Sequence, residues 1–145
     1  MATNIIAEFC QNHNGNVDIL NSMILEAKQN GASHAKIQGL YSSELTKRPE
    51  FELESQDEGS LLRPHQAEFD RLSKLDLTLE TESHFVEECK KSGIIPMTTV
   101  FTHLGLERAL KAGFKNFKIA SYDCASRELI SRILPYADEL VISTG

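Results

Sequence analysis

Three shortages in this sequence of 145 residues exclude several classes of protein. No apolar run approaches the roughly 18 to 20 residues that cross a bilayer, and the opening MATNIIAEF lacks the basic start and long apolar stretch of a signal peptide. The three cysteines are widely spaced, without a zinc-type CxxC pair, and indicate reduced thiols in a cytoplasmic protein. Basic residues are also scarce: 15 Lys and Arg against 21 Asp and Glu give a net charge of -6, which argues against nucleic acid or an anionic membrane as a partner.

The sequence does contain a regular alternation of short apolar segments and amphipathic segments. With 41% hydrophobic and 25% charged residues, the chain can bury one sizeable core. Strands are expected at residues 4–8, 33–38, 94–99, 117–120 and 139–143. Helices are expected at 17–30, 64–74, 79–92, 103–112 and 126–134, and the polar segment 39–63 is expected to be a surface loop. This alternation predicts βα units and an α/β fold with a parallel sheet.

The expected strands place polar side chains on a shared face. Residues two apart point to the same side of a strand, so Lys36 lies with Gln38, and Met97 lies with Thr99. Glu8 ends the first apolar segment in a similar way. Parallel α/β sheets bind ligands at the carboxyl ends of their strands, where helix N-termini and connecting loops meet. We therefore expect polar groups from several strands to form one site.

The residue types at these strand ends suit a phosphate group. Lysine supplies positive charge, and the hydroxyls of Ser and Thr supply short hydrogen-bond donors. The candidates are Lys36, Thr99, Lys118, Ser121 and Ser143. Two carboxylates, Glu8 and Asp123, can handle a sugar hydroxyl, a proton or a metal ion. Taken singly, each residue has a structural alternative, because a strand-end lysine often forms a salt bridge and a Ser or Thr there often caps a helix.

Five segments, in order, resemble motifs of the sialic acid synthase family. IIAEFCQNHNG resembles the family opening IAEIGxNHxG, and AKIQ resembles its K-F-Q. GIIPMTTVF, FKIASYD and VISTG resemble G-I-x-F-x-S-T-P-F, K-I-A-S-G-D/E and I-L-S-T-G. The resemblance implies that residues 1–145 form the amino-terminal part of a TIM barrel, with about five parallel strands and intervening helices. It also implies an enzyme that condenses phosphoenolpyruvate with an N-acetylated aldose such as N-acetylmannosamine, giving a nine-carbon 2-keto sugar acid and phosphate.

The resemblance also implies roles for individual residues. Matched to the family motifs, the phosphoenolpyruvate-binding residues are Lys36, Thr99, Lys118, Ser121 and Ser143. Glu8 and Gln38 would face the sugar, and Glu8 and Asp123 would assist catalysis. The family uses a divalent metal, Mn²⁺ or Mg²⁺, as a Lewis acid, but its two histidine ligands belong to strands that are absent here. No metal ligand is assigned to this chain, and His13 is expected to brace a loop.

Several positions depart from the family motifs. Cys10 and Tyr122 replace glycines, and glycine gives backbone freedom and close ligand approach, so Tyr122 would crowd or reshape the pocket. Val100 replaces a proline, and Thr102 replaces an aspartate. The largest departure from the family is the length of the sequence, because a TIM barrel has about 250 residues and eight strands. The remaining strands and the C-terminal antifreeze-like domain of the family are expected to be missing.

Two hypotheses from different classes follow. The first is a synthase acting on phosphoenolpyruvate and an N-acetyl amino sugar, active when a longer chain, a complementing polypeptide or a homo-oligomer supplies the missing barrel half. The second is a non-catalytic half-barrel, a binding or assembly protein that retains a phosphate site. A third, another phosphoenolpyruvate condensation such as deoxy-heptulosonate phosphate synthesis, is disfavoured by the QNHNG opening.

Overall fold

The structure, a computed structural model, describes residues 3–52 and 62–145, and these form a five-stranded parallel sheet with helices. The strands are β1 (Ile6–Cys10), β2 (His34–Gly39), β3 (Ile95–Val100), β4 (Asn116–Ile119) and β5 (Glu139–Ile142). They lie in the sheet in the order of the sequence, and every neighbouring pair is parallel. The expected α/β fold with five parallel strands is therefore confirmed.

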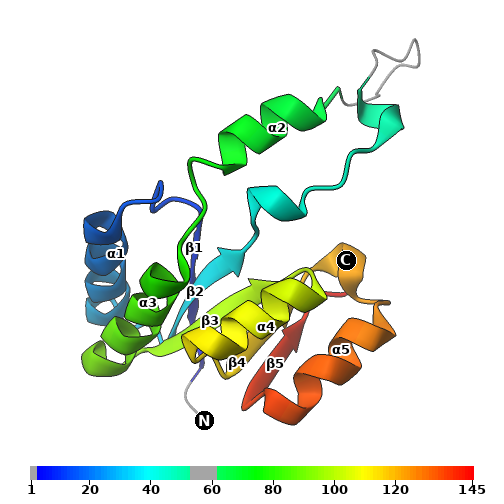
Figure 1. The fold of residues 1–145 in the computed structure, drawn as a ribbon. Helices are drawn as coiled ribbons and strands as arrows, with labels where there is room; N and C mark the ends of the chain where they lie inside the picture. Colours follow the sequence, from blue (N-terminus) through cyan, green and yellow to red (C-terminus); the bar gives the residue numbers. More distant parts are fainter. Residues whose placement is uncertain (1–2, 53–61) are drawn as a thin grey trace.

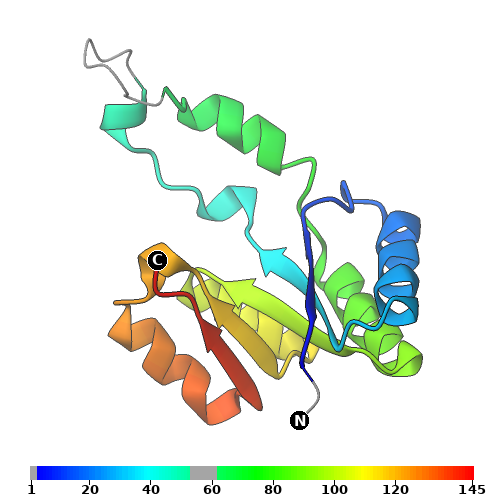
Figure 2. The ribbon, with the colours of Figure 1, turned by 180° about the vertical axis from the view of Figure 1, so that it is seen from behind.

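Four helices cover one face of this sheet. They are α1 (Val17–Gln29), α3 (Leu79–Ser92), α4 (His103–Ala112) and α5 (Arg127–Ile133). In Figure 1 the helices lie in front of the sheet or at its sides, and in Figure 2, seen from behind, the strands lie in front of α4. Right-handed crossovers between successive parallel strands put each connecting helix on the same side. This is the winding of a (β/α) barrel wall and differs from that of a doubly wound sheet.

The helix ends follow the signals in the sequence. Asn16 caps α1, because its side chain accepts hydrogen bonds from the backbone amides of Asp18 and Ile19. Gly93 follows α3 with a φ of 68°, a left-handed conformation that glycine adopts without strain. α3 and α4 have the expected bounds, α1 ends one residue earlier than expected, and α2 and α5 are one or two residues shorter at each end. None of the helices described is long and apolar enough to cross a membrane.

The connection from β2 to α3 extends beyond the carboxyl ends of the strands. We call residues 40–52 and 62–72 of this connection the arm; it ends in α2 (His65–Leu72) and projects from the sheet in Figure 1. The expected loop at 39–63 is partly helical, because Ser42–Glu44 and Pro49–Phe51 form 3-10 helices. Pro49 fixes a φ that suits the first turn of a helix. The remainder of the expected loop, residues 53–61, lies outside the described residues.

The hydrophobic core lies between the sheet and the helices. Ile37 of β2 and Phe117 and Ile119 of β4 point towards the helices and are fully buried. They meet Phe85 of α3 and Phe114, whose ring centroids are 6.0 Å apart. Because side chains alternate along a strand, the intervening residues of β2 and β4 point to the helix-free face.

The first strand differs from the expected strand at residues 4–8. β1 begins at Ile6 and continues to Cys10, and a bulge interrupts its pairing with β2 between Glu8 and Cys10. The ring of Phe9 is 4% exposed and meets the Phe85 ring edge-on, with centroids 6.2 Å apart. Because Phe9 packs in the core, the strand continues beyond Glu8, and Glu8 lies within β1. The bounds of β3, β4 and β5 differ from expectation by one residue.

The sheet is strongly curved. His34 of β2 is 1% exposed, and its Nε2 lies 2.9 Å from Oε2 of Glu139 in β5. Two strands separate β2 from β5, so a flat sheet would hold them roughly 14 Å apart at the usual strand spacing. The contact therefore requires the helix-free face to be concave, as the inner face of a barrel wall is.

Candidate functional site

A buried lysine on the helix-free face joins three strands. Lys36 of β2 is 3% exposed. Its Nζ lies 2.5 Å from Oε2 of Glu8 in β1 and donates a hydrogen bond to Oγ1 of Thr99 in β3 at 2.7 Å. The strand register explains both contacts, because Glu8 pairs with Lys36, and Thr99 pairs with Gln38 on the same face. The structure thus brings together residues that the sequence places on one face of separate strands.

Lys118 of β4 lies on the other side of Thr99, because the two residues are register partners. Burial lowers the pKa of Lys36, the Glu8 carboxylate opposes that shift, and the positive charge of Lys118 lowers the pKa further. The effect of Lys118 on Lys36 means that the two ammonium groups share one region of the concave face. Two cations on either side of a hydroxyl provide the donors that an oxyanion requires.

Glu8 balances the charge of Lys36. Its Oε1 accepts a hydrogen bond from the backbone N–H of Cys10 at 2.9 Å, while its Oε2 contacts the lysine. The Glu8 carboxylate is therefore fixed by two different groups. An ammonium has three N–H donors, and Lys36 uses two of them on Glu8 and Thr99, which leaves one for a ligand.

The other residues singled out by the resemblance lie nearer the rim. Gln38 is half-buried on the same face as Lys36. Ser121 and Ser143 follow β4 and β5. Ser121 is exposed and Ser143 is half-buried, and the backbone N–H of Ser143 donates to the carbonyl of Ile119 at 3.1 Å. In the part of the chain that the structure describes, neither serine hydroxyl hydrogen-bonds to a lysine. Their role in phosphate binding stays a prediction.

Asp123 lines a cavity of about 600 Å³ between the arm and the loops that follow β3 and β4. Its Oδ2 is buried and has no hydrogen-bond partner among the described residues, and burial raises the pKa of this carboxyl group. Tyr122 lines the same cavity, is 73% exposed and stacks on Phe101 with ring centroids 6.3 Å apart. The reshaping expected from Tyr122 therefore applies to this cavity.

The described residues do not fit the divalent metal that the resemblance implies. Within residues 3–52 and 62–145, no group of three or more His, Cys, Asp or Glu side chains could hold a metal ion. His13 is buried, and its Nδ1 accepts a hydrogen bond from the backbone N–H of Gly15 at 3.0 Å, so it braces the turn after β1. Burial lowers the pKa of this histidine.

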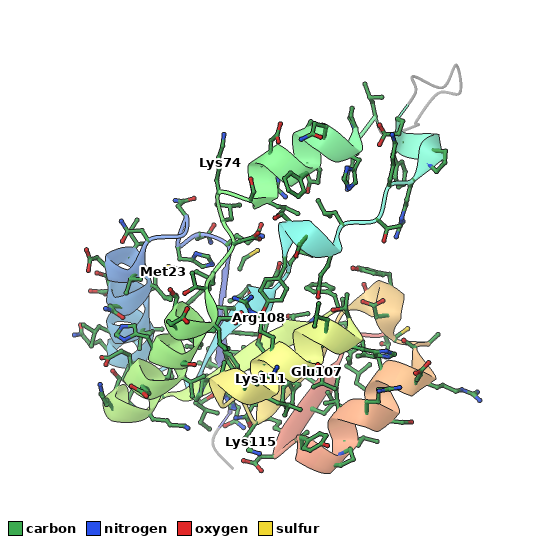
Figure 3. The ribbon with its side chains drawn as sticks, in the orientation of Figure 1. Met23, Lys74, Glu107, Arg108, Lys111 and Lys115 are labelled. Carbon is green, nitrogen blue, oxygen red and sulfur yellow. The ribbon has the colours of Figure 1, made fainter. Side chains whose placement is uncertain are left out.

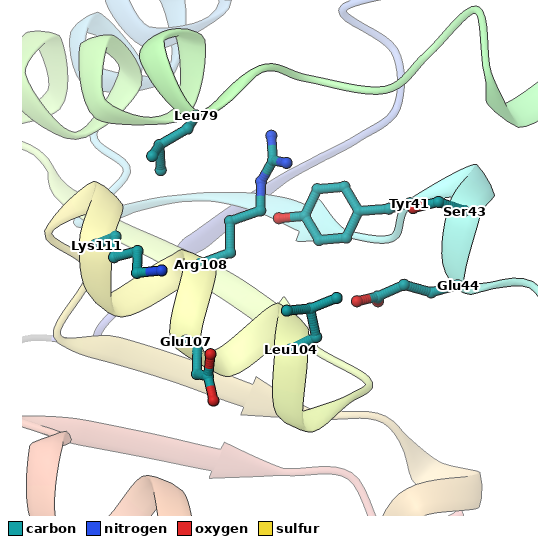
Figure 4. Close-up of a pocket in the computed structure, with 8 residues that line it drawn as sticks. All are labelled: Tyr41, Ser43, Glu44, Leu79, Leu104, Glu107, Arg108 and Lys111. Carbon is teal, nitrogen blue, oxygen red and sulfur yellow. The ribbon is translucent and has the colours of Figure 1, made fainter.

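A buried ionic network on the helix side was not predicted from the sequence. Glu82 of α3 is 2% exposed and accepts hydrogen bonds from the hydroxyl of Tyr41 at 2.5 Å and from Nε of Arg108 at 2.7 Å. The Arg108 guanidinium also lies over the Tyr41 ring and donates to the carbonyl of Leu77. Figure 3 places Arg108 on α4, and Figure 4 shows it beside Tyr41 in a cavity of about 260 Å³. The network fastens the start of the arm to α3 and α4, and no local pattern signals it, because its members lie 26 and 41 residues apart.

Comparison with known sequences agrees with the motifs. The model of the NeuB family matches residues 23–145. The N,N'-diacetyllegionaminic acid synthase of Campylobacter jejuni is 27% identical over 149 residues, which cover 99% of this chain and 42% of the relative. The enzyme of the same name from Legionella pneumophila is 26% identical over 145 residues, with coverages of 97% and 39%. The chain thus spans about two fifths of the length of these curated relatives.

Solved structures share the fold. The N-acetylneuraminic acid (sialic acid) synthetase of Leptospira borgpetersenii, in complex with citrate, matches with a TM-score of 0.77 and 23% identity, covering 100% of this chain and 45% of that chain. A putative spore coat polysaccharide biosynthesis protein E of Chromobacterium violaceum matches with a TM-score of 0.70 and 22% identity, covering 99% and 41%. At such identities the likeness shows the fold alone.

Proposed function

The chain belongs to the NeuB family, and from this premise we propose that it carries the phosphoenolpyruvate site of a sugar acid synthase. The acceptor would be an N-acylated amino sugar, N-acetylmannosamine or a close relative, and the product a nine-carbon 2-keto acid. The names of the relatives, a legionaminic acid synthase and a sialic acid synthetase, support this class of product. Because the chain spans about two fifths of the curated relatives, the complete reaction is proposed for the whole barrel.

The observation that carries the proposal is the placement of Lys36, Thr99 and Lys118. Three separate strands bring two ammonium groups and a hydroxyl to one concave face. Lys36 is 3% exposed, so its ion pair is not an ordinary surface salt bridge. Burying a charge is costly unless it is paired. Phosphoenolpyruvate carries a phosphate and a carboxylate, so its charge complements two lysines.

The proposed reaction forms one carbon–carbon bond and releases phosphate. C3 of phosphoenolpyruvate attacks the aldehyde carbon of the open-chain sugar, whose oxygen takes up a proton and becomes a hydroxyl. Water adds at C2, and the bond from C2 to the phosphate oxygen then breaks, leaving a ketone and inorganic phosphate. Lys36 and Lys118 hold the anionic donor and offset its charge. Glu8, Asp123 and Gln38 are the proposed groups for the sugar and for proton transfer.

Titration calorimetry of phosphoenolpyruvate into the chain tests the anion site. Lys36→Ala and Lys118→Ala should each weaken binding by about 10- to 150-fold, because each removes a charge-assisted contact of roughly 1.5–3 kcal/mol. Lys111→Ala is the matched control, since Lys111 is an exposed lysine on α4 on the helix side of the sheet (Figure 3). Equal phosphoenolpyruvate affinity in the native chain and in both site variants would contradict the proposed anion site.

A phosphate-binding half-barrel without catalysis is the second candidate. It is favoured by Tyr122, which stands where the family motif has glycine. Phosphate release from phosphoenolpyruvate, N-acetylmannosamine and Mn²⁺ separates the two candidates, measured on the chain alone and with candidate complementing chains. Release in any combination supports the synthase. Tight phosphoenolpyruvate binding with no release in every combination supports the binding protein.

A further inference from the structure

The end of β2 is tightly enclosed. Gly39 is the last residue of this strand and follows Gln38. A Cβ atom at Gly39 would lie 3.2 Å from the carbonyl oxygen of Thr99 and 3.3 Å from the hydroxyl oxygen of Tyr41. Both distances are shorter than the roughly 3.5–4.0 Å at which non-bonded carbon atoms pack best, so glycine allows an approach that a larger residue would hinder. The Tyr41 hydroxyl therefore lies directly against the backbone at the end of β2.

The position of that hydroxyl is set from the helix side of the sheet. Tyr41 is buried, and its hydroxyl donates to Oε1 of Glu82 in α3 at 2.5 Å. Oε2 of Glu82 accepts a hydrogen bond from Nε of Arg108 in α4 at 2.7 Å. The guanidinium carbon of Arg108 lies 4.3 Å from the centre of the Tyr41 ring. Each of the three side chains thus contacts the other two, and the hydroxyl cannot move without breaking a contact.

The backbone beside this hydroxyl carries the anion site. Oγ1 of Thr99 accepts a hydrogen bond from Nζ of Lys36 at 2.7 Å, and the Thr99 carbonyl faces Gly39 from the neighbouring strand. Lys36 lies in the same strand as Gly39, and Thr99 pairs with Lys118 of β4. A shift at Gly39 would therefore move the strand ends that carry these groups. A misplacement of about 1 Å can weaken a site about 100-fold.

Stability alone is a weak reason for this network. A buried ion pair can often be replaced by apolar side chains of similar volume without loss of stability, because the desolvation of two charges offsets their attraction. A fully hydrogen-bonded buried network instead makes the positions of its members unique. The group fixed here is the Tyr41 hydroxyl and, through it, the backbone of Gly39.

We propose that Tyr41, Glu82 and Arg108 are positioning residues of the anion site, which hold the ends of β2 and β3 in the arrangement that binds phosphoenolpyruvate. The inference rests on the proposed function and extends it to side chains on the helix side of the sheet, which act through Gly39 and Thr99. Arg108 is the accessible member, because 30% of its side chain is exposed and it borders the cavity of about 260 Å³ in Figure 4. A small cation in solution can therefore reach the place of its guanidinium.

Titration calorimetry with phosphoenolpyruvate tests the inference, with circular dichroism at the same temperature as the check that each variant is folded. Arg108→Ala should raise the Kd about five-fold or more. Guanidinium chloride, at a concentration too low to denature the chain, should restore the native Kd, whereas sodium chloride at equal ionic strength should not. Tyr41→Phe removes only the hydroxyl and should raise the Kd about three-fold or more. This conservative variant keeps the test open if Arg108→Ala does not fold.

Two control variants separate positioning from loss of stability. Ile133→Val removes a methylene from the buried core at α5, and Arg132→Ala breaks an exposed ion pair on the same helix. Both should leave the Kd for phosphoenolpyruvate unchanged. In a variant that is almost fully folded, unfolding cannot account for a raised Kd, because the apparent Kd varies with the inverse of the folded fraction.

The outcomes also separate this inference from the function on which it rests. A native Kd in folded Arg108→Ala and Tyr41→Phe, with a raised Kd in Lys36→Ala, overturns the positioning role and leaves the anion site standing. A Kd raised in Arg108→Ala alone, without rescue by guanidinium, overturns it too, since the effect would not pass through the Tyr41 hydroxyl. An equal rise in Ile133→Val would show loss of stability as the cause and overturn it as well. Native affinity in both Lys36→Ala and Lys118→Ala instead removes the proposed function.

Discussion

At the scale of single residues, Cys10 shows what a departure from a glycine motif does. Its φ is 51°, in the left-handed region that residues with a Cβ seldom adopt. The strain lies at the bulge that interrupts the pairing of β1 with β2, and the Cys10 N–H donates a hydrogen bond to the Glu8 carboxylate. The sequence identified the departure, and the backbone conformation shows that the family preference for glycine has a local physical cause.

Cys10→Gly should stabilise the chain by about 0.5–1 kcal/mol. Removing the strain of the left-handed conformation raises the free energy of unfolding by roughly 1–2 kcal/mol. The greater conformational freedom of glycine in the unfolded chain lowers it by about 0.5–1 kcal/mol. Urea unfolding measures the difference. Cys124→Gly is the control, since exposed Cys124 has a φ of -61° and the same change there should be destabilising. A lower urea midpoint for Cys10→Gly than for the native chain would contradict the argument.

At the scale of elements, the arm is held to the helices by pairs of side chains that no local sequence pattern predicts. The Tyr41–Glu82–Arg108 network joins residues just after β2 to α3 and α4. A second link runs from Oγ1 of Thr102, the cap of α4, to Oε2 of Glu44 at 2.8 Å. These contacts fix the base of the arm, which forms one side of the cavity that Asp123 also lines.

Arg108→Ala should lower the free energy of unfolding by about 3 kcal/mol, because it leaves the buried Glu82 carboxylate without its cation. Thermal or urea unfolding measures the loss. Arg132→Ala is the matched control, since Arg132 forms an exposed pair with Glu128 four residues away, and such pairs contribute about 0.5 kcal/mol or less. Similar losses in the two variants would show that the Glu82 network does not stabilise the fold.

At the scale of the whole molecule, two buried groups make stability depend on alkaline pH. Cys89 of α3 is fully buried there, and burial raises the pKa of its thiol from 9.0 to about 12. Burial and the Glu82 carboxylate also raise the pKa of Tyr41 above its ordinary 10.0. Between the ordinary and the raised values the folded chain binds more protons than the unfolded chain. The contribution of these two groups to stability is therefore constant below about pH 8 and falls as the pH rises beyond 9.

The free energy of unfolding should fall between pH 9 and 11, by roughly 1 kcal/mol per pH unit for each buried group that stays protonated. Urea unfolding at a series of pH values measures this slope. Cys89→Ala should reduce the slope from pH 9 upwards, whereas Cys124→Ala should leave it unchanged, since Cys124 is exposed. An equal slope in the native chain and in Cys89→Ala would rule out the buried thiol as its source.

The sequence predicted most of what depends on near neighbours. The alternation of side chains put Lys36 and Gln38 on one face, and the register confirms that Thr99 shares it. The caps at Asn16 and Gly93 act over two or three residues and were found in place. The order of five motifs indicated the family, which the NeuB match to residues 23–145 confirms. The binding roles of the site residues stay predictions.

The sequence by itself determined the element types, the faces of the strands and the family, because periods of two and 3.6 residues and cap signals are local properties. Only the tertiary structure decided that Glu8 neutralises Lys36, that Glu82 is shared by Tyr41 and Arg108, and that Oδ2 of Asp123 finds no hydrogen-bond partner among residues 3–52 and 62–145. His34 meets Glu139 across 105 residues of chain. Contacts over such separations depend on the curvature of the sheet and the packing of its helices, which no short stretch of sequence encodes.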